Sequence, residues 1–190
     1  MLTFRILLCS SLLSLVYGGE FDGAWWKSAS RARQTGFLDG ESDCHQYERK
    51  GVERGFRSVY QAADLLDDFY NKSERLGVPV RQALTMINVP SSPKPRGGSA
   101  HPEKHGYYDG LWWRGAGPEQ GGLGFVEGYL ACLPHGRSLY PKDRRVYAAL
   151  IDKWYQANPA KESAKIAEVL TSFAERPRPD GATKRAPAKE

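Results

Sequence analysis

The chain has 190 residues, a formal net charge of +5 and 26% charged residues. Beyond the N-terminus no stretch reaches the ~20 apolar residues that a membrane-spanning helix needs, which excludes a later transmembrane segment. Part of the positive charge falls in the proline-rich residues 176–190, so we expect a nearly neutral folded part and no nucleic-acid partner.

Residues 1–18 have the layout of a secretory signal peptide. Arg5 gives a positive start, an apolar run follows over 6–16, and Val16-Tyr17-Gly18 places tolerated residues at the cleavage position. The run is too short to span a bilayer. We therefore expect a cleaved signal and a periplasmic or secreted mature protein, with a retained anchor as the alternative.

One pattern occurs twice along the chain. The segment 21–27 (FDGAWWK) returns at 108–114 (YDGLWWR), and 36–40 (GFLDG) returns at 124–128 (GFVEG). The offset is 87 residues at the tryptophans and 88 at the glycines, so one residue is inserted between them. A fixed order at a nearly constant offset indicates duplication.

The composition divides the chain into five parts. A signal peptide precedes the first copy of the pattern, and a linker rich in proline, glycine and serine separates the copies. The last part is basic and proline-rich, which is typical of a disordered tail. The predicted parts are a signal peptide (1–18), repeat 1 (19–88), a linker (89–106), repeat 2 (107–175) and a tail (176–190).

The apolar spacing is helical throughout both copies, and strand-like alternation is not sustained. Ser28 or Ser30 is expected to cap a helix that runs through Gly36, and its counterpart is expected to run from Pro118 to about Pro134. Apolar stripes predict further helices over 59–70, 80–87, 146–155 and 166–173. We expect an all-α fold of two tandem units, each of about three helices, packed about a pseudo-twofold axis.

Small residues recur every four positions in both copies. They are Gly36, Gly40 and Cys44 in the first copy and Gly124, Gly128 and Cys132 in the second. A glycine inside a helix costs about 1 kcal/mol relative to alanine, and close approach of another backbone is a reason to keep it. If the two ridges face each other, the cysteines meet and form a disulfide. Two free buried cysteines are the alternative.

Asp39 and Glu127 occupy the same place in their copies. Paired carboxylates serve acid–base hydrolysis when they stand roughly 5–10 Å apart, so the two residues are weak candidates for a catalytic pair. Solvated or helix-capping acids are the favoured interpretation, because catalytic pairs lie in clefts that separate their pKa values.

The tryptophan pairs are the most unusual feature of the pattern. Trp25, Trp26, Trp112 and Trp113 could present aromatic faces to a sugar, which makes them candidates for ligand binding. Large aromatic side chains also dominate protein cores. Duplicated core anchors are therefore the favoured interpretation, and one member of each pair could serve each role.

No metal or cofactor is expected. His101 and His105 lie in the predicted linker together with Pro102, and a structural zinc site usually has four ligands. The histidines beside the cysteines do not match between the copies. Phosphate-binding loops, the Gly-x-Ser-x-Gly motif and the His-Glu-x-x-His motif do not occur.

The second copy resembles the Tai-type immunity domain, a small exported helical bundle of bacteria. The family pattern is a Gly-aromatic-aliphatic-x-Gly helix followed by a cysteine, and then a helix that ends before a proline. The matching residues here are Gly124-Phe125-Val126-Glu127-Gly128-Tyr129, Cys132, Tyr140-Pro141, Val146, Trp154-Tyr155 and Pro159. The resemblance implies a periplasmic helical domain, and some members neutralise cell-wall amidase toxins. Family members carry further cysteines, whereas this chain has one in each copy.

The complete layout also resembles uncharacterised exported bacterial proteins with paired Asp-Gly-x-Trp-Trp repeats. The leading hypothesis is an exported, non-enzymatic binding protein, such as an immunity-like inhibitor of an envelope enzyme or toxin. Its partner would be another envelope or secreted protein. A carbohydrate or peptidoglycan binder that uses the tryptophan pairs is the alternative. A glycan hydrolase that uses Asp39 and Glu127 is the third hypothesis.

Overall fold

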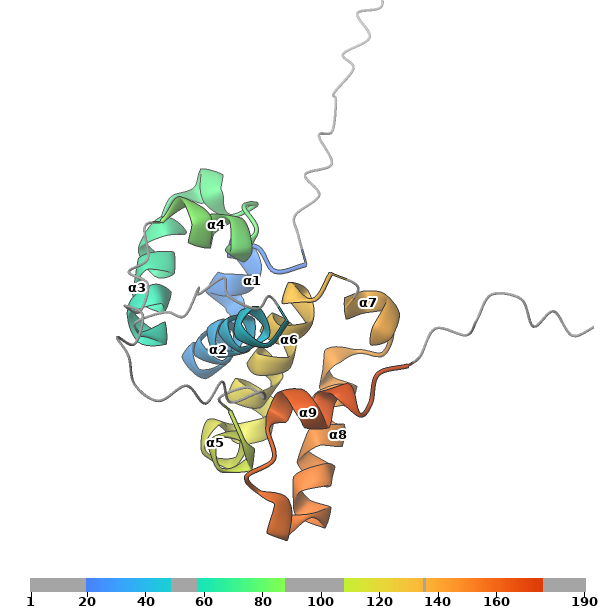
Figure 1. Cartoon of the computed structure of the whole chain (residues 1–190). Coiled ribbons are helices and arrows are strands. Elements are labelled where there is room, and N and C mark those ends of the chain that lie inside the picture. The colour runs from blue at the N-terminus through green and yellow to red at the C-terminus, as the bar shows by residue number, and fades with distance from the viewer. Residues whose placement is uncertain (1–19, 49–57, 88–107, 135, 176–190) are drawn as a thin grey trace, which may run out of the picture.

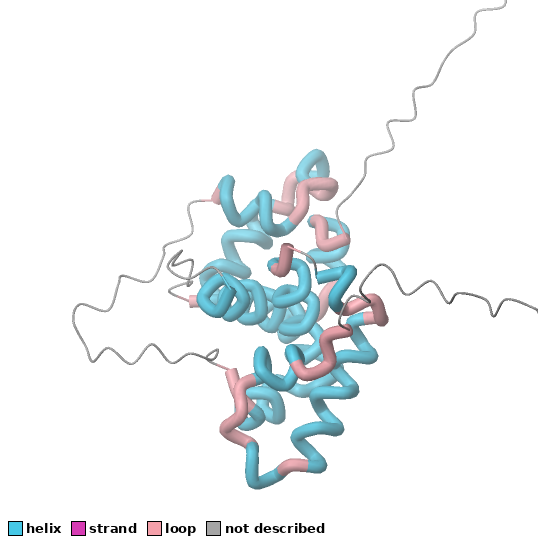
Figure 2. The backbone as a smooth tube through the Cα atoms, turned by 45° about the vertical axis from the view of Figure 1, so that its right-hand side comes forward, coloured by secondary structure: helices cyan, strands magenta, loops and turns pink. Residues whose placement is uncertain are grey.

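A computed structural model of the chain describes residues 20–48, 58–87, 108–134 and 136–175. Figure 2 shows this part as helices joined by short loops, and its extended pairing is limited to two isolated bridges. The predicted all-α fold is therefore confirmed for the described residues. None of the helices in these ranges has the length and apolar character needed to cross a membrane. The predicted signal, linker and tail lie outside the described residues.

The helices of each repeat form one group (Figure 1). The first group comprises α1 (Gly23–Ser28), α2 (Arg31–Glu48), α3 (Val59–Phe69), the 3-10 turn η1 (Ser73–Arg75) and α4 (Val80–Met86). The second comprises α5 (Gly110–Ala116), the π turn η2 (Gly117–Gly122), α6 (Leu123–Cys132), α7 (Gly136–Leu139), α8 (Arg144–Ala157), η3 (Pro159–Lys161) and α9 (Ile166–Thr171).

Side-chain caps set where several helices begin. Asp22 accepts a hydrogen bond from the backbone N–H of Trp25 at 3.0 Å, and Asp109 does the same for Trp112 at 3.2 Å. Ser30 caps α2, as one of the two predicted alternatives, by accepting from the N–H of Arg33. These contacts satisfy donors that lack a partner inside the first turn.

The inserted residue falls in the connection between α5 and α6. Gly117 ends α5 with a φ of 76°, which favours glycine. The six residues from Gly117 to Gly122 form a π turn, and a single-turn π segment accommodates an extra residue within a helix. The predicted start of this helical segment at Pro118 therefore lies in η2, and α6 proper begins at Leu123.

The doubled Asp-Gly-x-Trp-Trp pattern makes matching contacts in both halves. The indole N–H of Trp26 donates to Asp67 at 2.7 Å, and that of Trp113 donates to Asp152 at 3.3 Å. The glycine of each pattern leaves room for a tyrosine ring, Tyr70 in the first half and Tyr155 in the second. The second tryptophan of each pair is thus a buried anchor with a satisfied indole.

Two clusters of buried side chains form the core, and the central helices join them. The first cluster contains Trp26, Phe37 and Leu66, and the second contains Trp113 and Phe125. Side chains also cross between the halves: Cys44 of α2 packs in the second cluster, and Ala131 of α6 packs against the first. The interior is therefore shared by the two halves.

The glycine ridges face each other across α2 and α6. A Cβ on Gly36 would lie 2.1 Å from the carbonyl oxygen of Gly121, and one on Gly40 would lie 2.0 Å from that of Phe125. Gly124 and Gly128 meet the carbonyl oxygens of Arg33 and Phe37 in the same way. Each ridge glycine therefore contacts a backbone where any side chain would collide. These contacts pair equivalent repeat positions, while the pseudo-twofold axis itself stays a prediction.

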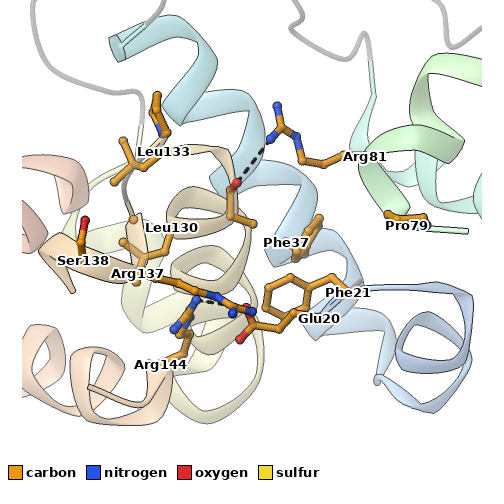
Figure 3. Close-up of a pocket in the computed structure, with 13 residues that line it drawn as sticks. Glu20, Phe21, Phe37, Pro79, Arg81, Leu130, Leu133, Arg137, Ser138 and Arg144 are labelled. Carbon is orange, nitrogen blue, oxygen red and sulfur yellow. Dashed lines mark hydrogen bonds and ion pairs between the residues drawn. The ribbon is translucent and has the colours of Figure 1, made fainter. Parts of the chain in front are cut away.

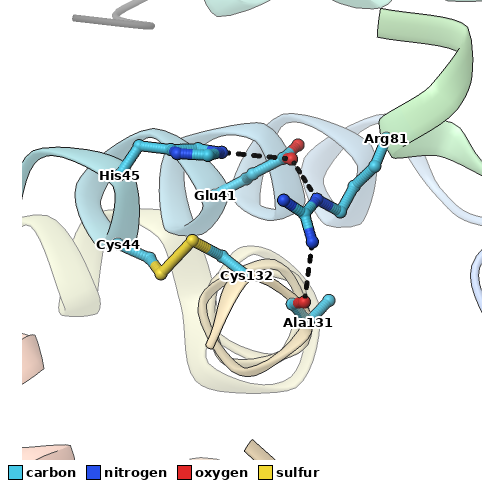
Figure 4. The surroundings of a disulfide bond; sticks show 6 residues. All are labelled: Glu41, Cys44, His45, Arg81, Ala131 and Cys132. Carbon is cyan, nitrogen blue, oxygen red and sulfur yellow. Dashed lines mark hydrogen bonds and ion pairs between the residues drawn. A yellow bond between two sulfur atoms is a disulfide. The ribbon is translucent and has the colours of Figure 1, made fainter. Parts of the chain in front are cut away.

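The ridges end in the predicted disulfide. Cys44 and Cys132 are bonded, with their Cα atoms 6.1 Å apart (Figure 4). The bond joins positions 88 residues apart and links α2 to the end of α6. It therefore closes the contact between the two halves covalently.

Candidate functional site

A pocket of about 480 Å³ opens where the two halves meet. Its lining comes from the segment before α1, from α2, from the start of α4 and from the region between the end of α6 and the start of α8 (Figure 3). Small-molecule sites span roughly 300–1,000 Å³. The cavity therefore has the size to hold a small ligand or a few residues of a partner.

Two arginines hold a carboxylate at one side of the pocket. Arg137 of α7 donates to Glu20 Oε2 at 2.7 Å, and Arg144 of α8 donates to the same oxygen at 3.3 Å (Figure 3). The Arg144 side chain is 15% exposed, whereas that of Arg137 is 76% exposed. The guanidinium of Arg144 is thus part of the pocket wall, and that of Arg137 lies beside it at the protein surface.

Arg144, the more buried of the two arginines, is incompletely satisfied among the described residues. The Nε of Arg144 is buried and meets no hydrogen-bond acceptor there. A buried donor without an acceptor costs about 1–3 kcal/mol. Arg144 therefore retains a donor for one more acceptor.

The wall beside the arginines is apolar. Phe21 and Phe37 contact each other with ring centroids 5.1 Å apart, and Leu130 lies on the same cavity from α6. The remaining apolar lining residues are Pro79, Ala131, Leu133 and Pro134. The pocket therefore combines cationic donors with a surface that favours an apolar group.

A third arginine lines the pocket from α4. Arg81 donates from Nε to Glu41 at 3.1 Å and from a terminal nitrogen to the carbonyl oxygen of Ala131 at 3.4 Å (Figure 4). The Glu41 side chain is buried, and its Oε1 also lies 3.7 Å from Nε2 of His45. These contacts fix Arg81 to both central helices, next to the disulfide.

Asp39 and Glu127 are buried, so the favoured interpretation as solvated or helix-capping acids is wrong. Each has a side-chain partner from the other half. The hydroxyl of Tyr108 donates to the carboxylate of Asp39 at 2.5 Å. Arg33 donates to both carboxylate oxygens of Glu127, from Nε at 2.8 Å and from a terminal nitrogen. Burial raises the pKa of Asp39 to about 6, although the Tyr108 hydrogen bond opposes this and the charge of Asp43 adds to it.

Burial likewise raises the pKa of Glu127, against the lowering effects of Arg33 and Arg144, and the charge of Glu20 adds to the rise. Neither carboxylate lines the pocket described above. The arrangement is that of two interface contacts rather than two acids that face a common cleft.

The candidate tryptophans divide into two kinds. Trp26 and Trp113 are fully buried and present no face to a ligand. Trp25 is partly buried against the rings of Phe21 and Phe37, with centroids 5.1 and 5.0 Å away.

Trp112 packs in the equivalent way between Tyr108 and Phe125, with centroids 5.0 and 5.4 Å away. The tryptophans predicted as candidates for ligand binding are thus engaged mainly in packing the two halves.

Among the described residues, no three potential metal ligands come together.

The pocket residues were missed by sequence reasoning because they come from segments far apart in the chain. One sequence signal does mark one of them: Arg144 stands two positions before Val146, as Arg57 stands two before Val59. Arg57 itself lies outside the described residues. A search for repeated charges, in addition to repeated aromatic and small residues, would have selected this position.

Comparisons with models of protein families, with curated protein sequences and with solved structures give no match to this chain.

Proposed function

We propose that this chain is an exported, non-enzymatic binding protein and that the pocket between its halves receives a partner protein. The observation that carries the proposal is the pocket, in which arginines from separate elements adjoin an apolar wall. Asp39 and Glu127 are engaged in contacts between the halves, so no observation favours hydrolysis.

Export is supported by two independent features. The first is the predicted signal peptide over 1–18. The second is the disulfide between Cys44 and Cys132, a bond that persists mainly in oxidising compartments. A periplasmic or secreted location is therefore part of the proposal.

The resemblance to Tai-type immunity domains suggests the kind of partner. It favours an envelope enzyme or toxin that this chain would inhibit by binding. The centre, where a disulfide and close glycine contacts join α2 and α6, suits such a role, because a preformed surface loses little conformational freedom when a partner binds. The carbohydrate alternative rests on Trp25 and Trp112, the partly exposed members of the pairs.

Affinity capture from envelope extract of the source cells tests the proposal. The immobilised full chain is compared with Ser138→Trp, which places an indole at an exposed lining position of the pocket. Ser163→Trp is the matched control, because Ser163 is also exposed and is not a lining residue.

We expect one enriched protein on the wild-type chain and on Ser163→Trp, and its loss on Ser138→Trp. Equal capture by all three chains would move the binding site away from the pocket. Capture of glycan without protein would favour the tryptophan alternative.

A further inference from the structure

We propose that the pocket binds the C-terminal carboxylate of a polypeptide whose last residues are apolar, and that Glu20 occupies this carboxylate position internally. The inference rests on the proposed binding function and names the part of the partner that enters the pocket.

The position of the two guanidinium groups carries the first step. Arg137 and Arg144 both reach Glu20 Oε2, so the pocket already displays the contacts that two arginines make with a carboxylate. Arginine matches carboxylates with paired, charge-assisted donors. A ligand carboxylate that replaced Glu20 could use both of its oxygens on the two guanidinium groups.

Glu20 is more exposed than Arg144, the more buried of its two arginine partners. It lies outside the helices, before α1, and its side chain is 39% exposed. The next residue is anchored, because the carbonyl oxygen of Phe21 accepts from the N–H of Val80 at 2.8 Å. Glu20 can therefore leave the arginines without disturbing the helices, as an internal substitute for a ligand must.

The apolar wall distinguishes among anions. A hydrated inorganic anion would leave the accessible apolar lining of Phe21, Leu133 and Pro134 uncovered, whereas an apolar group joined to a carboxylate would cover it. Arg81 adds a donor that suits a peptide carbonyl oxygen. A fatty-acid tail has no acceptor for that donor, so the site fits the end of a polypeptide better than a lipid.

Calorimetric titration of the purified full chain, with its disulfide formed, tests the inference with three probes. They are an N-acetylated tripeptide ending in leucyl-phenylalanine, the same peptide with a C-terminal amide, and decanoate. We expect the free acid to bind about tenfold or more tightly than the amide, because only the acid offers a charged pair of acceptors. Added salt should weaken binding of the acid.

Variants then locate the site. Arg137→Gln and Arg144→Gln should each weaken binding of the acid, whereas the exposed neighbour Arg145→Gln, outside the pocket lining, should leave it unchanged. Glu20→Gln should tighten binding several-fold, because the internal competitor is lost. Thermal melts identify any variant that fails to fold, and Glu20→Gln and Arg137→Gln change exposed or partly exposed side chains.

Each contrary result has a distinct meaning. Equal binding of acid and amide would overturn the carboxylate anchor, and preference for decanoate would overturn the polypeptide end. Weaker binding of the acid by Glu20→Gln would overturn the assignment of Glu20 as an internal occupant of the carboxylate position. If the peptides fail while capture still depends on Ser138, only this inference is wrong; if both fail, the proposed function fails with it.

Discussion

The carboxylate of Asp39 lies in the contact between the halves, where Tyr108 is its hydrogen-bond donor. Burial raises its pKa from the ordinary 3.8 to about 6. Between these two pH values the folded protein retains a proton that the unfolded chain has released. The free energy of unfolding should therefore fall as the pH rises from about 4 to about 6, and then level off.

Asp39→Asn should remove this dependence. The amide keeps an acceptor for Tyr108 and carries no charge, so we expect stabilisation of up to roughly 3 kcal/mol at pH 7.5 and little change at pH 4. Urea denaturation at both pH values measures the free energy of unfolding of the variant and of the wild type. Asp68→Asn, a change of an exposed carboxylate, is the control. A variant less stable than wild type at pH 7.5 would contradict burial of the charge.

The second buried carboxylate depends on Arg33. Removing one partner of a buried ion pair leaves the other charge without compensation and typically costs 3–5 kcal/mol. Arg33 is partly exposed, so we expect the lower end, about 3 kcal/mol, for Arg33→Met at neutral pH. The double change with Glu127→Leu should recover most of the loss. A double variant as unstable as the single one would show that Arg33 acts through its packing on Trp25.

At the scale of elements, the central feature is the crossing of α2 and α6. Their glycines contact carbonyl oxygens of the facing helix, so even one methyl group must separate the backbones. This contact explains why both copies tolerate glycines that lower helix propensity.

Gly40→Ala and Gly128→Ala should each destabilise the fold by at least about 2–3 kcal/mol, because their Cβ atoms would lie within 2.0 Å of a backbone oxygen. Gly115→Ala is the control: this glycine also lies in a helix, and nothing lies within 4 Å of the position that its methyl group would occupy. It should be neutral or slightly stabilising. Similar melting temperatures for all three variants would mean that the helices separate at little cost.

At the scale of the whole molecule, one covalent bond joins two halves that already share their interior. Without the Cys44–Cys132 bond, the unfolded chain gains conformational freedom, because two positions 88 residues apart are no longer held together. The chain-entropy relation gives roughly 4–5 kcal/mol for a loop of that length.

We therefore expect Cys44→Ala with Cys132→Ala to lower the free energy of unfolding by about that amount. Denaturant titration of the oxidised wild type and the double variant measures the loss. Mass analysis after alkylation of the unfolded, unreduced protein checks the bond directly. Two alkylated thiols on these cysteines would contradict it.

The local sequence pattern determined the helices and much of what joins them. Spacing of three and four residues placed α3 and α8, because an apolar stripe on a helix must face a core. The four-residue spacing of glycines and cysteines predicted close helix contact and the disulfide, since only small residues allow such an approach. The duplicated aromatics indicated core anchors, and Trp26 and Trp113 are buried as that interpretation requires.

Only the tertiary structure decided the partners of the charged residues and the place of the pocket. Asp39 and Glu127 occupy equivalent positions, yet one meets Tyr108 and the other Arg33, because the residues that face them differ between the copies. Glu20, Arg137 and Arg144 converge from distant segments. Local spacing specifies which face of a helix is apolar, but only packing specifies which side chains meet across it.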